Sequence, residues 1–249
     1  MAVITAIMLS TPVDAQKGGT FKGIITYDVT YPGMNIEPSQ MANLPQKVIL
    51  TTNGELVKFD IAMTSMNQSM IINPEAKTTT LLLEMMGNKV MLKPKKGDVP
   101  AGKEPEVKIT PETKEIAGYL CKRAEISFGD EKSKADPVVV FFSEELGSNK
   151  LFYDNEYRTL PGIPLEFTYK MQGRNMHMVA KTVEKTRVSS KDLAVPSEYQ
   201  EMTPEQLRQM FGGNYLHTFY SCRQALQYFV DIFKRPYCEI LPVFVIFAF

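Results

Sequence analysis

A two-residue alternation of apolar and polar side chains begins at Thr20 and constrains the fold of this chain more than any other feature. Successive side chains of an extended strand point to opposite faces, so period-two alternation is typical of a half-buried strand. In the first run the apolar positions that share one face are Phe21, Ile25, Tyr27, Val29 and Tyr31. We therefore expect an antiparallel strand here.

Residues 47–63 contain the clearest hairpin pattern. Asn53-Gly54 separates two alternating runs, and both residues tolerate the positive φ angles that a type I′ turn requires. In the second arm Val57, Phe59, Ile61 and Met63 fall on one face. The sequence thus predicts two paired strands joined by a two-residue turn.

The middle of the chain repeats this pattern. We expect a turn at residues 73–76, another at Gly87-Asn88, and a solvated loop over residues 94–105. Residues 114–128 read as a strand with a bulge at Gly118, and residues 137–142 form a continuous apolar strand.

The segment from Leu160 to Ala180 predicts a second hairpin. Pro161-Gly162 is turn chemistry, and Pro164 fits only the start or the edge of a strand. After a turn at residues 173–175 the partner strand follows. The alternating positions of the two arms are Leu165, Phe167, Tyr169 and Met171, then Met176, Met178, Ala180 and Thr182.

Only one segment has helical punctuation. Thr203 suits the N-cap, Pro204 the first helical position and Gly212 the C-cap. Leu207, Met210 and Phe211 form its apolar edge, which predicts a short helix with one buried side.

The two ends of the chain differ from its body. Residues 1–15 combine an apolar run with a small-residue ending at Ala15, which favours a signal peptide and a mature chain that starts near Gln16; the alternative is a buried first strand. Residues 16–213 are expected to form the β domain. The aromatic-rich residues 214–249 are interpreted as an atypical tail outside that domain, and we assign them no function.

Composition excludes several classes of protein. Lys+Arg and Asp+Glu number 28 each, so the chain lacks the basic excess that nucleic-acid binding needs. Of the cysteines, only Cys121 lies in the body, and Cys222 and Cys238 have no zinc-site spacing. We expect no metal, no cofactor and no membrane-spanning segment, since the apolar C-terminal run is far shorter than a membrane helix.

The sequence contains no catalytic motif that we recognise. Phosphate-binding loops, His-Glu-x-x-His, Cys-x-x-Cys and Gly-x-Ser-x-Gly are all absent. His177 is interpreted as a strand histidine and Cys121 as a buried, inert thiol. We therefore predict that the chain is not an enzyme and name no catalytic residue. His177 bonded to both a carboxylate and a hydroxyl in a cleft would count against this.

Three segments resemble the DUF4412 family of exported Bacteroidetes-type proteins, which is similar to the GLPGLI family. They are residues 116–124, IAGYLCKRA, residues 160–166, LPGIPLE, and residues 196–204, in which PSEY precedes MTP. Ile163-Pro164 departs from the GLPGLI signature. The resemblance covers residues 20–213 and implies a fold like that of lipoprotein carriers, namely a curved antiparallel sheet or half-open barrel whose concave face is covered by short helices. It brings no catalytic residues.

Methionines in the strand region suggest a ligand for such a half-barrel. Unbranched thioether side chains adapt to irregular apolar shapes, so a concave face that they line could hold a lipid or another apolar molecule. The candidate lining residues are Phe59, Met63, Met70, Phe167, Tyr169, Met171, Met176 and Met178. The alternative is that these side chains are ordinary core. The sequence thus leaves two hypotheses, a periplasmic or secreted carrier of an apolar ligand and an envelope module that docks to another protein.

Overall fold

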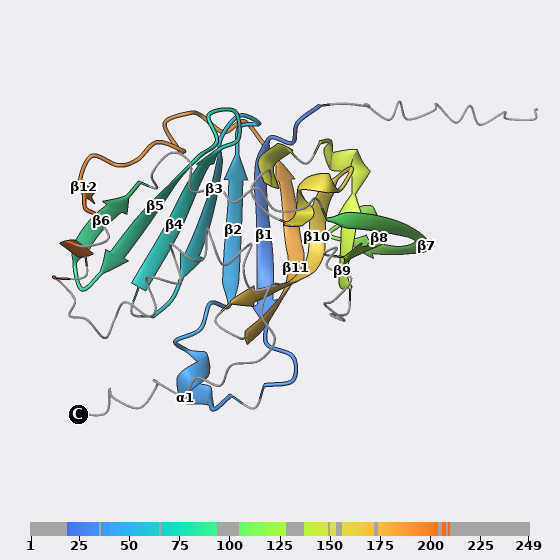
Figure 1. Cartoon of the computed structure of the whole chain (residues 1–249), viewed down its shortest axis with the longest axis horizontal. Coiled ribbons are helices and arrows are strands. Elements are labelled where there is room, and N and C mark those ends of the chain that lie inside the picture. The colour runs from blue at the N-terminus through green and yellow to red at the C-terminus, as the bar shows by residue number, and fades with distance from the viewer. Residues whose placement is uncertain are drawn as a thin grey trace, which may run out of the picture.

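The computed structural model describes residues 19–34, 36–64, 66–93, 105–127, 137–148, 150–152, 156–171, 174–203, 206, 207 and 209. Within these ranges the chain forms a single open sheet of twelve strands, with only short helical turns beside it (Figure 1). The mainly β prediction is confirmed. The predictions for residues 1–15, for most of the 94–105 loop and for residues 214–249 lie outside the described residues.

The strands follow the alternating runs of the sequence closely. They are β1 (Gly23–Thr30), β2 (Lys47–Thr52), β3 (Val57–Ala62), β4 (Met66–Asn73), β5 (Thr78–Met85), β6 (Asn88–Leu92), β7 (Glu106–Ile116), β8 (Tyr119–Ser127), β9 (Val138–Ser143), β10 (Ile163–Met171), β11 (Arg174–Lys185) and β12 (Gln200–Glu201). The helical elements are α1 (Pro38–Met41), η1 (Glu144–Leu146), η2 (Lys150–Phe152) and η3 (Glu156–Thr159).

Neighbours in the sheet are mostly neighbours in sequence. The order is β12-β6-β5-β4-β3-β2-β1-β11-β10-β9-β8-β7, so β1 lies in the middle and joins the two series. Eleven strands pair antiparallel, as short hairpin connections require. The prediction of a purely antiparallel sheet needs one correction, because β12 pairs parallel to β6 after the chain has crossed back from β11.

The sheet curves strongly at its β7 end. Four strand spacings separate β7 from β11, which amounts to about 19 Å in a flat sheet. Backbone atoms of the two strands nevertheless approach within 8 Å. Lys114 Nζ of β7 also reaches Glu166 Oε2 of β10 at 2.5 Å, across β8 and β9. The half-open barrel expected from the sequence is therefore the observed architecture.

Turns occur where the sequence predicts them, but two of them differ in type from the prediction. Asn53 does not adopt a positive φ, and the β2–β3 loop spans four residues. Instead, Asn53 Oδ1 accepts hydrogen bonds from the backbone N–H groups of Glu55 and Leu56, at 3.0 and 2.8 Å. Asparagine thus closes this loop through its side chain.

The two-residue turns with positive φ at both positions occur elsewhere. Met86-Gly87 joins β5 to β6, and Ala117-Gly118 joins β7 to β8. The bulge predicted at Gly118 is therefore wrong, because this glycine supplies the positive φ of a tight hairpin turn. What reads as one strand over residues 114–128 is the end of β7, a two-residue turn and β8.

A bulge also interrupts β11. Its register shifts opposite Thr26 and Tyr27, so Ala180 pairs with Tyr27 while Thr182 pairs with Thr26. Met176, Met178 and Ala180 are buried as the alternation predicts, whereas Thr182 is exposed. One extra residue reverses the face of every following side chain.

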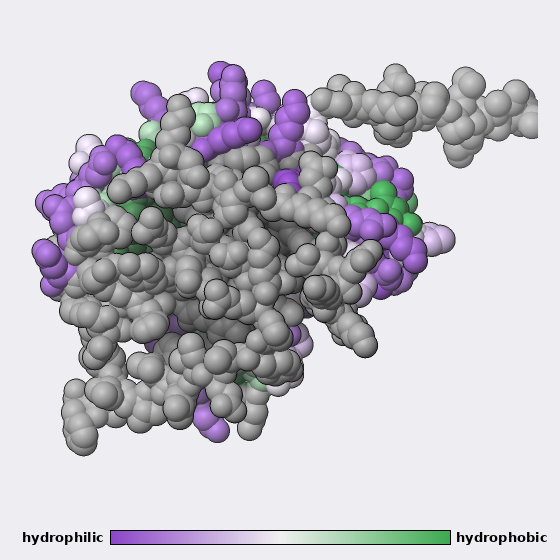
Figure 2. All heavy atoms as spheres, viewed as in Figure 1, coloured by the Kyte–Doolittle hydropathy of each residue, from purple (hydrophilic) through white to green (hydrophobic). Residues whose placement is uncertain are grey.

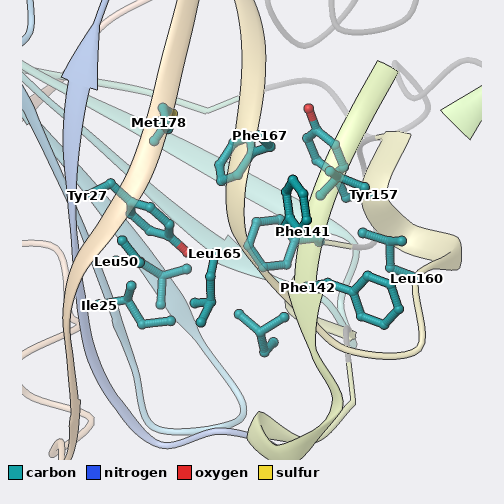
Figure 3. Close-up of a cluster of buried hydrophobic side chains, with 14 of the residues drawn as sticks. Ile25, Tyr27, Leu50, Phe141, Phe142, Tyr157, Leu160, Leu165, Phe167 and Met178 are labelled. Carbon is teal, nitrogen blue, oxygen red and sulfur yellow. The ribbon is translucent and has the colours of Figure 1, made fainter. Parts of the chain in front are cut away.

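The concave side of the central strands is filled by the segment between β9 and β10. Leu151 and Phe152 of η2, Tyr157 of η3, and Leu160 are all buried in the main core. Phe167 of β10 lies between Tyr27 and Tyr157, with ring centroids 5.6 and 5.0 Å away in edge-to-face geometry (Figure 3). The prediction of short helices over the concave face is thus confirmed, although the sequence did not identify this segment as their source.

On the face that Figure 2 shows, most of the coloured surface is hydrophilic. Figure 2 also shows one group of hydrophobic side chains where β7 and β8 lie in Figure 1. The exposed large apolar residues of β7, β8 and β9 are Ile109, Leu120 and Val139.

Candidate ligand site on the concave face

Apolar side chains of β4, β5 and β6 form a second cluster, separate from the main core. Leu81 and Leu83 of β5, Val90 of β6 and Leu207 of the C-terminal helical turn are buried in it. Strand register explains their meeting, because Met70 pairs with Leu81 and Leu81 pairs with Leu92. Partly buried residues surround them: Met66, Met70, Met85, Leu92 and Met202. We call these nine residues the methionine cluster.

A helical turn at residues 206–207 places Leu207 in this cluster. Thr203 Oγ1 accepts a hydrogen bond from the Gln206 backbone N–H at 3.1 Å, and Gln206 Oε1 accepts one from the Thr203 N–H at 2.8 Å. This reciprocal pair is a capping box, so the predicted N-cap is confirmed. Met210, Phe211 and Gly212 lie outside the described residues.

The predicted lining residues do not form one site. Phe167, Met176 and Met178 are buried in the main core, where neighbouring side chains enclose them. Their burial agrees with the alternative interpretation of these side chains as ordinary core. Their residue type and strand face suggested a ligand surface. In the structure, residues of the segment between β9 and β10 are buried in the same core.

Two other predicted residues lie further along the sheet. Phe59 of β3 is partly buried against the main core, where it packs on Phe152 of η2 with ring centroids 5.9 Å apart. Met70 pairs with Phe59 across β3 and β4 and belongs to the methionine cluster. Met63 is half-buried beyond the end of β3. The side chains of Tyr169 and Met171 lie outside the described residues.

Sequence reasoning missed part of this cluster. Leu81, Leu83 and Val90 looked like ordinary strand residues, and Met202 and Leu207 are distant in sequence. Their common face follows only from the register of β4, β5 and β6 and from the path of the chain after β11.

Residues 198–202 include the edge strand β12 and wrap around its neighbour β6. Tyr199 packs on the outer face beside Ile71, Leu82 and Met91, whereas Met202 packs on the concave face. A pocket of about 300 Å³ lies between this segment and the β5–β6 turn. Its lining residues are Gly87, Asn88, Lys89, Val90, Glu198, Gln200 and Met202.

His177 lies between a carboxylate and a hydroxyl on β10 and β11. Its Nε2 is 3.3 Å from Glu166 Oε1, and its Nδ1 is 3.2 Å from Thr168 Oγ1. Glu166 is also paired with Lys114 at 2.5 Å. Thr168 and His177 are directly opposed in the ladder, and Thr168 is next but one to Glu166 on β10, so neighbouring strand positions account for the contacts.

His177 contacts both a carboxylate and a hydroxyl, which is the first part of the condition that would favour an enzyme; the second part is a cleft around them. None of these side chains lines the pocket at β6, and Glu166 is shared with a lysine rather than committed to the histidine. Nucleophilic catalysis also needs an oriented substrate and donors for a developing oxyanion. The prediction that the chain is not an enzyme stays a prediction.

Cys121 is fully buried and lies in the main core. Burial, followed by the nearby carboxylates of Glu145 and Glu166, raises the pKa of its thiol to about 11. A thiol that keeps its proton is a poor nucleophile. The geometry therefore agrees with the interpretation of Cys121 as a structural residue.

Within the described ranges, no group of three or more histidine, cysteine, aspartate or glutamate side chains could hold a metal ion. A search of the same ranges also finds no helix of the length and apolarity needed to cross a membrane. No family model matches the chain, and no curated protein matches it either. Membership of the DUF4412 family accordingly stays a prediction.

Proposed function

We propose that this chain is an exported, non-catalytic protein of the cell envelope that binds a lipid or another apolar ligand on the concave face of its sheet. The observation that carries the proposal is the division of that face into two parts. The main core is closed by η2 and η3, whereas the methionine cluster forms a separate apolar surface over β4, β5 and β6.

Side-chain chemistry supports a ligand at the methionine cluster rather than in the main core. Met66, Met70 and Met85 are each only partly buried, unlike Met176 in the core. Methionine has three rotatable side-chain bonds and a polarizable sulfur, so a surface built from it can repack around acyl chains of different shape.

Native mass spectrometry of the full chain after gentle purification tests the proposal. We expect co-purifying lipid and saturable binding of an apolar fluorescent dye. Met70→Gln should weaken dye binding several-fold, because it places an amide where the ligand needs an apolar contact. Met86→Gln is the matched control, since Met86 is 76% exposed in the β5–β6 turn. Absence of both lipid and dye binding would contradict the proposal.

Export is the second element of the proposal and has its own test. We expect the chain, expressed with its own N-terminus in a Gram-negative host, to appear in the periplasmic or secreted fraction. Terminal sequencing should find a mature end near Gln16. An uncleaved chain in the cytoplasm would contradict export without affecting ligand binding.

A protein-interaction module is the alternative function, and one observation favours it. Ile109, Leu120 and Val139 are exposed apolar side chains on consecutive strands at one end of the sheet. The β7 edge itself is poorly suited to strand addition, because its register is interrupted between Ile109 and Thr113, and Pro111 lies within that interruption. Leu120→Ser would abolish capture of an envelope partner under the alternative and leave dye binding intact.

A further inference from the structure

The pocket at β6 combines polar and apolar walls. Asn88, Lys89 and Glu198 provide hydrogen-bonding and charged groups, while Val90 and Met202 also belong to the methionine cluster. Val90 and Met202 lie on the concave side, whereas Lys89, the residue before Val90 on β6, lies over the Tyr199 ring on the outer side, with its Nζ 5.9 Å from the ring centroid; the pocket is therefore at the edge of the sheet, between its two faces. Its volume of about 300 Å³ is at the lower end of the range for small-ligand sites.

Both charges in the pocket are accessible. Lys89 Nζ lies 3.2 Å from Glu198 Oε1, and the two side chains are 34% and 52% exposed. The hydrogen bond to Glu198 raises the pKa of Lys89. A backbone hydrogen bond, together with Lys89, lowers the pKa of Glu198. Both groups are thus ionised at neutral pH, and an exposed pair of this kind exchanges partners at little cost.

The presence of opposite charges restricts the kind of head group that fits. A purely anionic group beside Lys89 would also face Glu198, and a purely cationic group beside Glu198 would face Lys89. A head group with one anion and one cation can pair with both side chains at once. Like-charge contacts are then avoided, which is how charge complementarity selects a partner.

We propose that this pocket holds the phosphate and ammonium groups of a zwitterionic amphiphile, whose hydrocarbon chain lies on the methionine cluster. This inference rests on the proposed function, since it needs an apolar ligand on the concave face. Lys89 pairs with the phosphate, Glu198 pairs with the ammonium group, and Asn88 donates a hydrogen bond from its amide.

Competition binding with the full chain tests the inference. The probes are tetradecanoyl lysophosphatidylethanolamine and tetradecanoyl monoglyceride, both below their micellar concentrations, and free glycerophosphoethanolamine. We expect the lysophospholipid to bind about fivefold more tightly than the monoglyceride, the order typical of charged contacts at a partly exposed site. The free head group should not displace it at equal concentration.

A matched pair of double variants identifies the residues. Lys89→Gln/Glu198→Gln should abolish the preference for the lysophospholipid and leave monoglyceride binding unchanged. Lys93→Gln/Glu201→Gln is the control, because that ion pair is only 2.6 Å long and joins the same two segments, yet it does not line the pocket. The control should retain the full preference.

Equal affinity for the two lipids, or a preference that survives in the Lys89/Glu198 variant, refutes the head-group site and leaves the proposed function standing. Displacement by free glycerophosphoethanolamine as effectively as by the lipid shows a site for a small polar molecule instead. Binding of neither lipid rejects the proposed function and the head-group site together.

Discussion

Phe152 of η2 is the side chain through which the covering segment meets the middle of the sheet. It is 2% exposed, and its ring packs edge to face on Phe59 of β3. Because Phe59 pairs with Met70 of the methionine cluster, Phe59 connects Phe152 to the proposed ligand surface. We predict that Phe152→Ala both destabilises the fold and enlarges the apolar space available to a ligand.

The size of the effect follows from the burial. Truncation of a fully buried phenylalanine to alanine costs about 3–5 kcal/mol, which includes the lost aromatic contact and the cavity that remains. For a chain of this length each kcal/mol lowers the melting temperature by about 2–4 °C. The expected decrease is therefore about 6–20 °C.

Thermal and urea unfolding followed by circular dichroism measure the stability, and titration with an apolar dye measures the enlarged space. Leu120→Ala is the control, because Leu120 is 58% exposed and its truncation should change stability by less than 1 kcal/mol. A Phe152→Ala variant as stable as the Leu120→Ala variant would refute the role of η2 as a packed cover. If Phe152→Ala lowers stability as expected but dye binding does not increase, the prediction that its cavity enlarges the apolar space available to a ligand is refuted.

Two further substitutions and one chemical modification test the core. Tyr27→Phe should cost about 1–2 kcal/mol in urea unfolding, because it leaves the buried Pro164 carbonyl without the hydroxyl that donates to it at 2.9 Å. Ser143→Ala should leave stability unchanged or raise it by up to about 1 kcal/mol, since the buried Ser143 Oγ has no hydrogen-bond partner in the described part of the chain. A loss of stability above about 1 kcal/mol would contradict this and indicate that the hydroxyl has a partner. In a Cys222→Ser/Cys238→Ser background, Cys121 should resist alkylation at pH 8 until urea unfolds the chain. Because folding raises the pKa of this thiol from about 9 to about 11, its contribution to stability is complete below pH 9 and is lost as the pH rises toward 11; a pH-independent stability across this window would contradict the assignment.

Predictions from local sequence succeeded where a single strand or cap decides the outcome. Ile25 and Tyr27 lie on the buried face because alternation requires it, and Thr203 forms a cap because its hydroxyl lies within reach of Gln206. Turn types were less predictable. Asn53-Gly54 and Ala117-Gly118 both contain a suitable glycine, yet only the second forms a two-residue turn.

The candidate site was the least predictable feature. Met176 and Met70 both alternate on the concave face of a strand, so no local property distinguishes them. Met176 is buried in the main core together with residues of η2 and η3, whereas Met70 belongs to the methionine cluster together with Met202 and Leu207, which follow β11. Contacts with segments distant in sequence therefore decide which of these two methionines is core.

By itself, the sequence determined the strands and the buried face of most of them, because alternation and turn residues act within a few positions of one another. The open, curved class of sheet was expected only from the family resemblance. Only the tertiary structure decided which methionines are core and which form a separate surface, and that Lys89 and Glu198 meet beside that surface. Such contacts depend on strand order and on the return of the chain from β11 to β6, which are set by packing between residues far apart in sequence.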